Sequence, residues 1–87
     1  MRLSEKELLQ RLNEAKQQVS VGSLYQHYKS PDMIYRVLDI VIHEADDMPC
    51  VIYQAQYGEG ITFSRPVTSW IEKVNSADES VHRFTKI

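Results

Sequence analysis

The sequence predicts a mainly β protein, namely a small barrel of about five strands preceded by one amphipathic α-helix. The 87 residues suffice for one small domain. Apolar side chains recur at steps of three and four near the N-terminus, and from Gly22 onward they alternate with a period of two. The connections between the alternating segments are short, so the strands must curl to bury one face. A small barrel is therefore favoured over a sandwich.

The helix is expected from about Ser4 to Gln18. Ser4 and Glu7 have the spacing of a capping box, and Glu7 and Arg11 are expected on the solvent side. One stripe of the helix carries Leu8, Leu12, Ala15 and Val19, with Leu9 on its flank. We divide the chain into this helix, over residues 1–21 and packed on the barrel, and a barrel domain over residues 22–87. The alternative use of the stripe is a homodimer seam.

The strands follow in short succession. The alternation predicts strands over Ser23–Lys29, Ile34–His43, Cys50–Tyr57, Ile61–Ser64 and Val81–Ile87. Turn chemistry separates them at Ser30–Asp32, in the acidic turn Glu44–Pro49 and at Gly58–Gly60. An apolar pattern around Trp70, Ile71 and Val74 is followed by a polar loop over Asn75–Ser80. Because Ile34–His43 is apolar on both faces, we expect the N-terminal helix to cover it.

Charge and composition restrict the partners and the location. Residues 22–87 hold six basic and nine acidic side chains with no basic tract, which argues against binding to nucleic acid or to an anionic membrane. No apolar run approaches the roughly 18 residues of a transmembrane helix, and the charged N-terminus lacks the apolar stretch of a signal peptide. The single cysteine, Cys50, predicts a reducing, cytoplasmic setting.

Four segments in this order resemble a known bacterial family, the domain of unknown function 1653. They are Gly22–Lys29 (GSLYQHYK), Tyr35–Leu38 (YRVL), Val51–Gly58 (VIYQAQYG) and Ser64–Pro66 (SRP). The resemblance covers about residues 22–87 and implies an SH3-like β-barrel, but it implies no activity. The chain departs from the family pattern at Ile61–Ser64, where many members have Leu-Trp, and at Trp70, where many have Phe.

Six side chains form the candidate binding set: His27, Lys29, Tyr53, Tyr57 and Arg65, with Tyr25 near them. In a curled sheet they can converge on one rim. Histidine changes charge near neutral pH, arginine offers a fork for carboxylate or phosphate, and tyrosine gives a flat amphipathic surface. The set suits a peptide or a small anionic ligand. In the structural alternative, the tyrosines and His27 join strand ends and Arg65 pairs with a carboxylate of the barrel.

Catalytic, cofactor and metal motifs are not found in the sequence. The histidines share no ligand spacing, the turn after His43 is expected to be a solvated acidic turn, and Cys50 is expected to be a small buried or edge thiol. We therefore predict a non-enzymatic binding module that needs no cofactor or metal. The alternatives are a small enzyme with His27 as acid or base and Arg65 as anion clamp, and a purely structural assembly domain. The expected state is a monomer, or a weak homodimer through the helix.

Overall fold

The computed structural model describes residues 3–87 and confirms a mainly β fold with an N-terminal helix. In chain order its elements are α1 (Glu5–Gln18), β1 (Leu24–His27), β2 (Ile34–His43), β3 (Met48–Ala55), β4 (Thr62–Pro66), α2 (Val67–Trp70), β5 (Lys73–Ser76), β6 (Glu79–His82) and β7 (Phe84–Lys86). Residues 1 and 2 of the predicted N-terminal unit lie outside the described residues.

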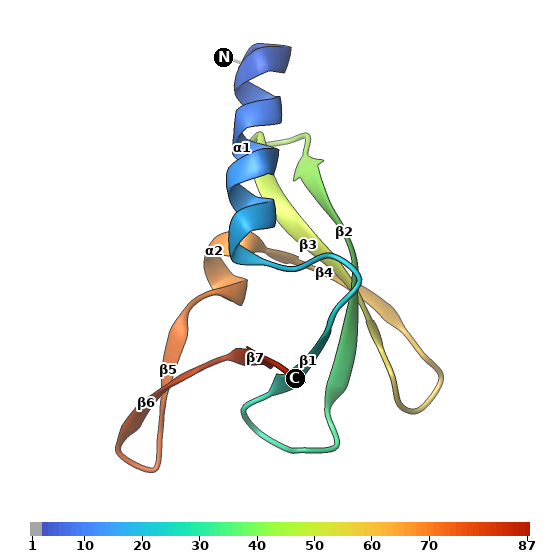
Figure 1. Cartoon of the computed structure of the whole chain (residues 1–87), viewed down its shortest axis with the longest axis vertical. Coiled ribbons are helices and arrows are strands. Elements are labelled where there is room, and N and C mark those ends of the chain that lie inside the picture. The colour runs from blue at the N-terminus through green and yellow to red at the C-terminus, as the bar shows by residue number, and fades with distance from the viewer. Residues whose placement is uncertain (1–2) are drawn as a thin grey trace.

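Five strands form the main sheet, in the order β4-β3-β2-β1-β7, with every neighbouring pair antiparallel. Strands β5 and β6 form a separate hairpin, which projects from the body at the lower left of Figure 1. Within residues 3–87, β4 and β7 are the two ends of the strand order, so the ladder does not close into a barrel. The sheet is nevertheless curled, since the Arg65 guanidinium on β4 lies 5.6 Å from the ring centroid of Phe84 on β7.

A bulge in β2 decides which of its side chains reach the core. The pairing with β3 shifts between Val37 and Asp39, which inserts one residue and reverses the alternation. Tyr35 and Val37 before the shift and Ile40 after it are therefore all buried, while Leu38 at the shift is 41% exposed. The strict alternation predicted for this strand fails at the bulge, where Ile40 shares the buried face with Val37.

The C-terminal third differs most from the prediction. The apolar pattern around Trp70 belongs to the short helix α2, and the expected polar loop is the hairpin of β5 and β6. Its turn places Ala77 and Asp78 at φ of 50° and 65°, the left-handed conformation that Gly and Asn usually mark in a sequence. Without either residue at the turn, the sequence lacked the hairpin signal. The predicted last strand is divided between β6 and β7.

Helix α1 begins as predicted. The Ser4 hydroxyl accepts from the Glu7 amide at 3.2 Å, and the Glu7 carboxylate accepts from the Ser4 amide at 3.1 Å. Its apolar stripe contacts the core mainly through the C-terminal turns, where Ala15 is buried and Val19 at the C-cap is fully buried. The flanking side chain of Leu9 is 53% exposed. A homodimer through this helix stays a prediction.

Aromatic rings fill the centre of the curled sheet. Trp70 of α2 stacks on Phe84 with ring centroids 3.7 Å apart, and the edges of Tyr25 and Tyr53 meet Trp70 at 5.3 and 4.9 Å. These rings connect the first strand β1, the inner strand β3 and the last strand β7. The short helix α2 therefore closes the core on the side where the sheet is open.

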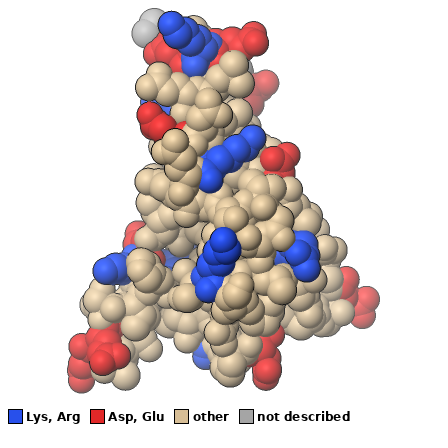
Figure 2. Space-filling model, viewed as in Figure 1, with Lys and Arg blue, Asp and Glu red and all other residues tan. Residues whose placement is uncertain are grey.

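Charged side chains are dispersed over the surface. On the face drawn in Figure 2, the Lys and Arg side chains do not gather into one patch, and those near the top lie beside acidic side chains. Within residues 3–87, no helix has both the length and the apolar character needed to span a membrane.

Candidate functional site

An open pocket of about 290 Å³ brings together four of the six predicted site residues. It is lined by His27, Lys29, Met33, Tyr35, Tyr53, Phe63, Arg65 and Phe84. The predicted members are His27, Lys29, Tyr53 and Arg65. The other four lining residues were not predicted as site residues.

Strand pairing explains why these side chains share one face. Tyr53 pairs with Phe63 across β3 and β4, two positions from the pair of Val51 with Arg65, so Phe63 and Arg65 point to the same side of the sheet. On the other edge, His27 of β1 pairs with Phe84 of β7. Because the sheet is curled, Phe63 and Arg65 on β4 face His27 and Phe84 across the pocket.

Two hydroxyls and an aromatic ring hold Arg65 in place. Its Nε donates to the Tyr53 hydroxyl at 3.5 Å and its Nη1 to the Ser69 hydroxyl at 2.9 Å, while its Cζ lies over the Phe84 ring. Within residues 3–87, no Asp or Glu side chain forms an ion pair with this guanidinium. The structural alternative, in which Arg65 pairs with a carboxylate of the barrel, is therefore not what this part of the chain shows.

His27 is buried, and one nitrogen of its ring is bound by the backbone. Its Nδ1 accepts from the Lys29 amide at 3.2 Å, so the neutral ring carries its proton on Nε2. Burial, followed by the charges of Lys29, Arg65 and Arg83, holds the pKa of His27 below its ordinary value. The nitrogen lone pair that a general base requires is therefore engaged by the backbone, and the remaining ring N–H is a donor suited to an anion.

The local charge around the pocket is positive although the whole chain carries −2. Lys29 is exposed at the rim and Arg65 is half-buried. Arg83 lies nearby, but its Nη2 donates to Glu72 at 2.8 Å and its Nε donates to the Ser69 carbonyl at 3.2 Å. Lys29 and Arg65 therefore leave two cations at the pocket without an ion-pair partner among the described residues.

Tyr57 and Tyr25, the other two predicted residues, do not line the pocket. Tyr57 is 42% exposed, and its hydroxyl lies 2.6 Å from the hydroxyl of Tyr35. Burial is the largest cause that raises the pKa of Tyr35, and the hydrogen bond with Tyr57 adds to it. Tyr25 packs against Trp70, and its hydroxyl accepts from the Ser20 amide at 2.9 Å. The structural interpretation fits Tyr25, while Tyr57 contacts the pocket residue Tyr35 through its hydroxyl.

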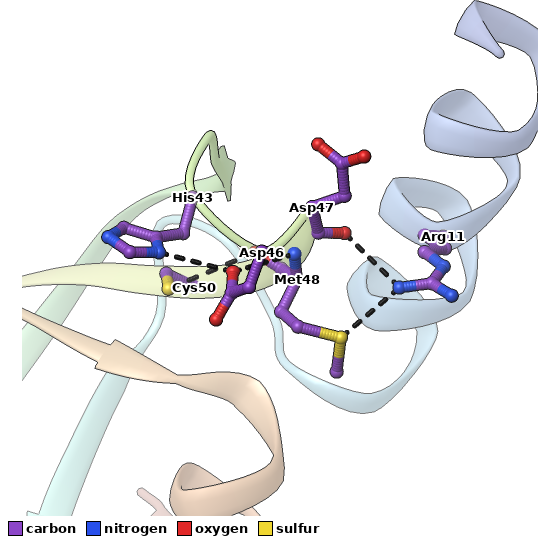
Figure 3. A network of polar contacts seen from close by, with 6 residues as sticks. All are labelled: Arg11, His43, Asp46, Asp47, Met48 and Cys50. Carbon is purple, nitrogen blue, oxygen red and sulfur yellow. Dashed lines mark hydrogen bonds and ion pairs between the residues drawn. The ribbon is translucent and has the colours of Figure 1, made fainter. Parts of the chain in front are cut away.

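The acidic turn after His43 is shown in Figure 3. The His43 Nδ1 lies 3.1 Å from the Asp46 carboxylate, which also accepts from the Met48 amide at 3.1 Å. Both contacts lower the pKa of Asp46, and the hydrogen bond from the Met48 amide has the larger effect. In the described part of the chain, no three His, Cys, Asp or Glu side chains are placed to hold one metal ion.

Arg11 reaches this turn from α1. Its Nη1 donates to the Asp47 carbonyl at 3.2 Å and approaches the Met48 sulfur at 3.1 Å, and in Figure 3 the Asp47 carboxylate points away from it. Arg11 was expected on the solvent side, but it joins the helix to the β2–β3 turn. The Cys50 side chain beside this turn is buried, and burial raises the pKa of its thiol, which disfavours the nucleophilic thiolate.

Comparisons with known proteins give a family and a fold. Residues 23–86 match the family described as a protein of unknown function, DUF1653. The chain is similar to a DUF1653 protein from Bordetella bronchiseptica of known crystal structure, with a TM-score of 0.69 and 24% sequence identity over 80% of this chain and 90% of that chain. At this identity the likeness shows the fold alone. No curated protein matches the chain.

Proposed function

The chain belongs to the DUF1653 family of proteins of unknown function, and we propose that it is a non-enzymatic binding module. Its ligand is a small anion or the acidic part of a peptide, bound in the pocket between β1, β4 and β7. We also propose that the curled sheet is related to an SH3-like barrel that is open between β4 and β7. The single cysteine is a buried thiol, which supports a cytoplasmic location.

The observation that carries the proposal is Arg65. A guanidinium has five N–H donors, and the described contacts of Arg65 use only its Nε and one Nη1 hydrogen. Tyr53, Ser69 and the Phe84 ring fix its plane, so little side-chain entropy is lost when an anion binds. Lys29 adds a second cation, and the buried His27 ring has a free N–H to donate. A carboxylate or phosphate satisfies all three groups together.

The same geometry disfavours catalysis by His27. A general base must present a free lone pair to its substrate, and the Nδ1 lone pair accepts from the Lys29 amide. The pocket is open, and a fold of 87 residues gives little depth from which water can be excluded. We therefore treat His27 as a ligand donor rather than as an acid or base.

Anion titration tests the proposal. We expect glutarate and inorganic phosphate to cause saturable amide shifts at Lys29, Phe63 and Arg65 in NMR spectra of the full chain. Arg65→Gln should weaken that binding by about tenfold or more, the cost of one lost charge-assisted contact. Arg36→Gln is the matched control, because Arg36 is exposed on β2 and does not line the pocket. Absence of saturable shifts, or equal losses in the two variants, would contradict the proposal.

A further inference from the structure

The outer edge of β4 offers backbone groups that no strand of the described chain uses. The Ala55 amide donates to the Ile61 carbonyl at 2.9 Å, which makes this a hydrogen-bonded pair of the antiparallel register. Such pairs recur at every second residue, so positions 63 and 65 also bond to β3. Thr62 and Ser64 between them turn their N–H and C=O groups away from β3, and β4 is the end of the strand order.

This edge runs directly beside the anion pocket. Phe63 and Arg65, which alternate with the outward-turned residues, line the pocket. Phe63 is 41% exposed and Ile61, which precedes the strand on the same side, is 58% exposed. A chain that paired with β4 would therefore place every second side chain next to an apolar surface and a cation.

We infer that β4 accepts an extended peptide by β-strand addition, with a Glu or Asp side chain of the peptide directed to Arg65 and Lys29. The inference rests on the proposed function, because it assigns the pocket anion to a peptide carboxylate. Strand addition satisfies the outward groups of Thr62 and Ser64 by main-chain hydrogen bonds, while the pocket selects the side chain. The carboxylate matches the two cations that lack an ion-pair partner within residues 3–87.

The length of β4 limits the size of the partner segment. The strand has five residues and ends at Pro66, which has no N–H to donate. Short length and a terminal proline are also ways in which proteins protect a sheet edge from aggregation. An added peptide can therefore pair only around Thr62 and Ser64, so most of its specificity must come from the acidic side chain in the pocket.

The test uses a set of acetylated heptapeptides with a central Glu and varied flanking residues, titrated into the full chain. For each peptide that binds, we prepare a version in which Gln replaces the central Glu. We also prepare two versions with N-methylated backbone amides, one at the odd-numbered and the other at the even-numbered residues of the peptide. We expect the Gln version to bind about tenfold more weakly. One of the two N-methylated versions should lose binding and the other should keep it, because only alternate amides of the peptide face β4. The amides of Thr62 and Ser64 should become protected from hydrogen exchange.

A pair of protein variants completes the test. Ser64→Pro removes an outward N–H without removing a bond to β3, so it should lose the peptide and keep glutarate. Ser64→Ala keeps the amide and should bind both. If no peptide binds, or both N-methylated versions bind alike, while glutarate still binds, strand addition is wrong and the anion pocket stands. If neither glutarate nor any peptide binds, both proposals are wrong.

Discussion

The chemistry of the pocket depends on how single side chains are restrained. Arg65 is held by two hydroxyls and an aromatic ring rather than by a carboxylate, and His27 is restrained by an amide two residues further along the chain. Each contact uses part of the donor or acceptor capacity of its side chain and leaves the rest for a ligand. A single carboxylate close to Arg65 would neutralise the charge of this side chain. Within residues 3–87 no such pair forms, so the guanidinium keeps its charge for a ligand.

His27 should make the stability of the protein depend on pH. Its pKa is lowered in the folded state from an ordinary 6.5, so the unfolded chain takes up the proton first as the pH falls. The stability contributed by the neutral ring is complete above about pH 6.5 and is lost as the pH falls toward the lower folded pKa. Urea unfolding at about pH 7.5 and about pH 5.5 should show a smaller decrease for His27→Gln than for wild type.

His82→Gln is the matched control for this measurement. His82 is exposed on β6 and does not line the pocket, so this variant should keep the wild-type dependence on pH. The carboxyl groups with lowered pKa values, Glu7 and Asp46, have ordinary values of 4.5 and 3.8 and titrate below the measured range. If His27→Gln kept the full decrease, the histidine would not be its source.

Residue types and spacing indicated some of the residues that line the pocket but not the others. His27, Lys29, Tyr53 and Arg65 stand out because their chemistry suits an anion, and the structure gathers them. The lining rings of Tyr35, Phe63 and Phe84 look like core or strand residues in the sequence. Their role depends on the curl of the sheet, which brings β4 and β7 together, and no local pattern encodes that approach.

At the scale of elements, the limits of prediction are bulges and turns. The bounds of β2 were predicted correctly at Ile34–His43, because its β-branched residues form a continuous run. The bulge between Val37 and Asp39 was not, since an inserted residue leaves no mark in an apolar segment. The β5–β6 hairpin was missed for a related reason, because its turn uses Ala77 and Asp78 where a glycine or asparagine is the usual signal.

The end of α1 provides a second prediction. Val19 is fully buried in the core, while Val21, two residues later, is 44% exposed. Val19→Ala removes two buried methyl groups and leaves a cavity, which should cost about 2 kcal/mol and lower the melting temperature by roughly 8–16 °C. Val21→Ala should change the stability by less than about 0.5 kcal/mol. Similar melting temperatures for the two variants would contradict the burial pattern.

The core of the curled sheet must be covered by elements other than strands. The five-stranded sheet has two edge strands, β4 and β7. Trp70 of α2 and the last turns of α1 close the core between them. The sequence predicted a helix and a curled sheet from periodicity, and it predicted their packing from the need to cover apolar residues. The structure places the contact at Ala15 and Val19 of the predicted stripe and leaves Leu9 on its flank exposed, because the helix meets the sheet at its C-terminal end.

We expect α1 to be an integral part of this core. Val19 and Ala15 lie in the buried cluster, Leu12 packs against it, and the Ser20 amide donates to the buried Tyr25. Full burial of one such aliphatic side chain contributes about 1.5–3 kcal/mol, against a total of roughly 5 kcal/mol for so small a domain. A chain that begins at Val21 should therefore lose most of its stability, or aggregate through the uncovered apolar face.

Thermal unfolding and sedimentation of that shortened chain check the prediction, with a chain that begins at Leu3 as the control that keeps α1. We expect the control to melt as a folded species and the shortened chain to melt far lower or to sediment as aggregates. Melting of both within a degree or two would mean that the sheet closes its own core. The helix would then be an appendage whose apolar stripe is available to a partner, and the homodimer through α1 would become the leading explanation for its amphipathic pattern.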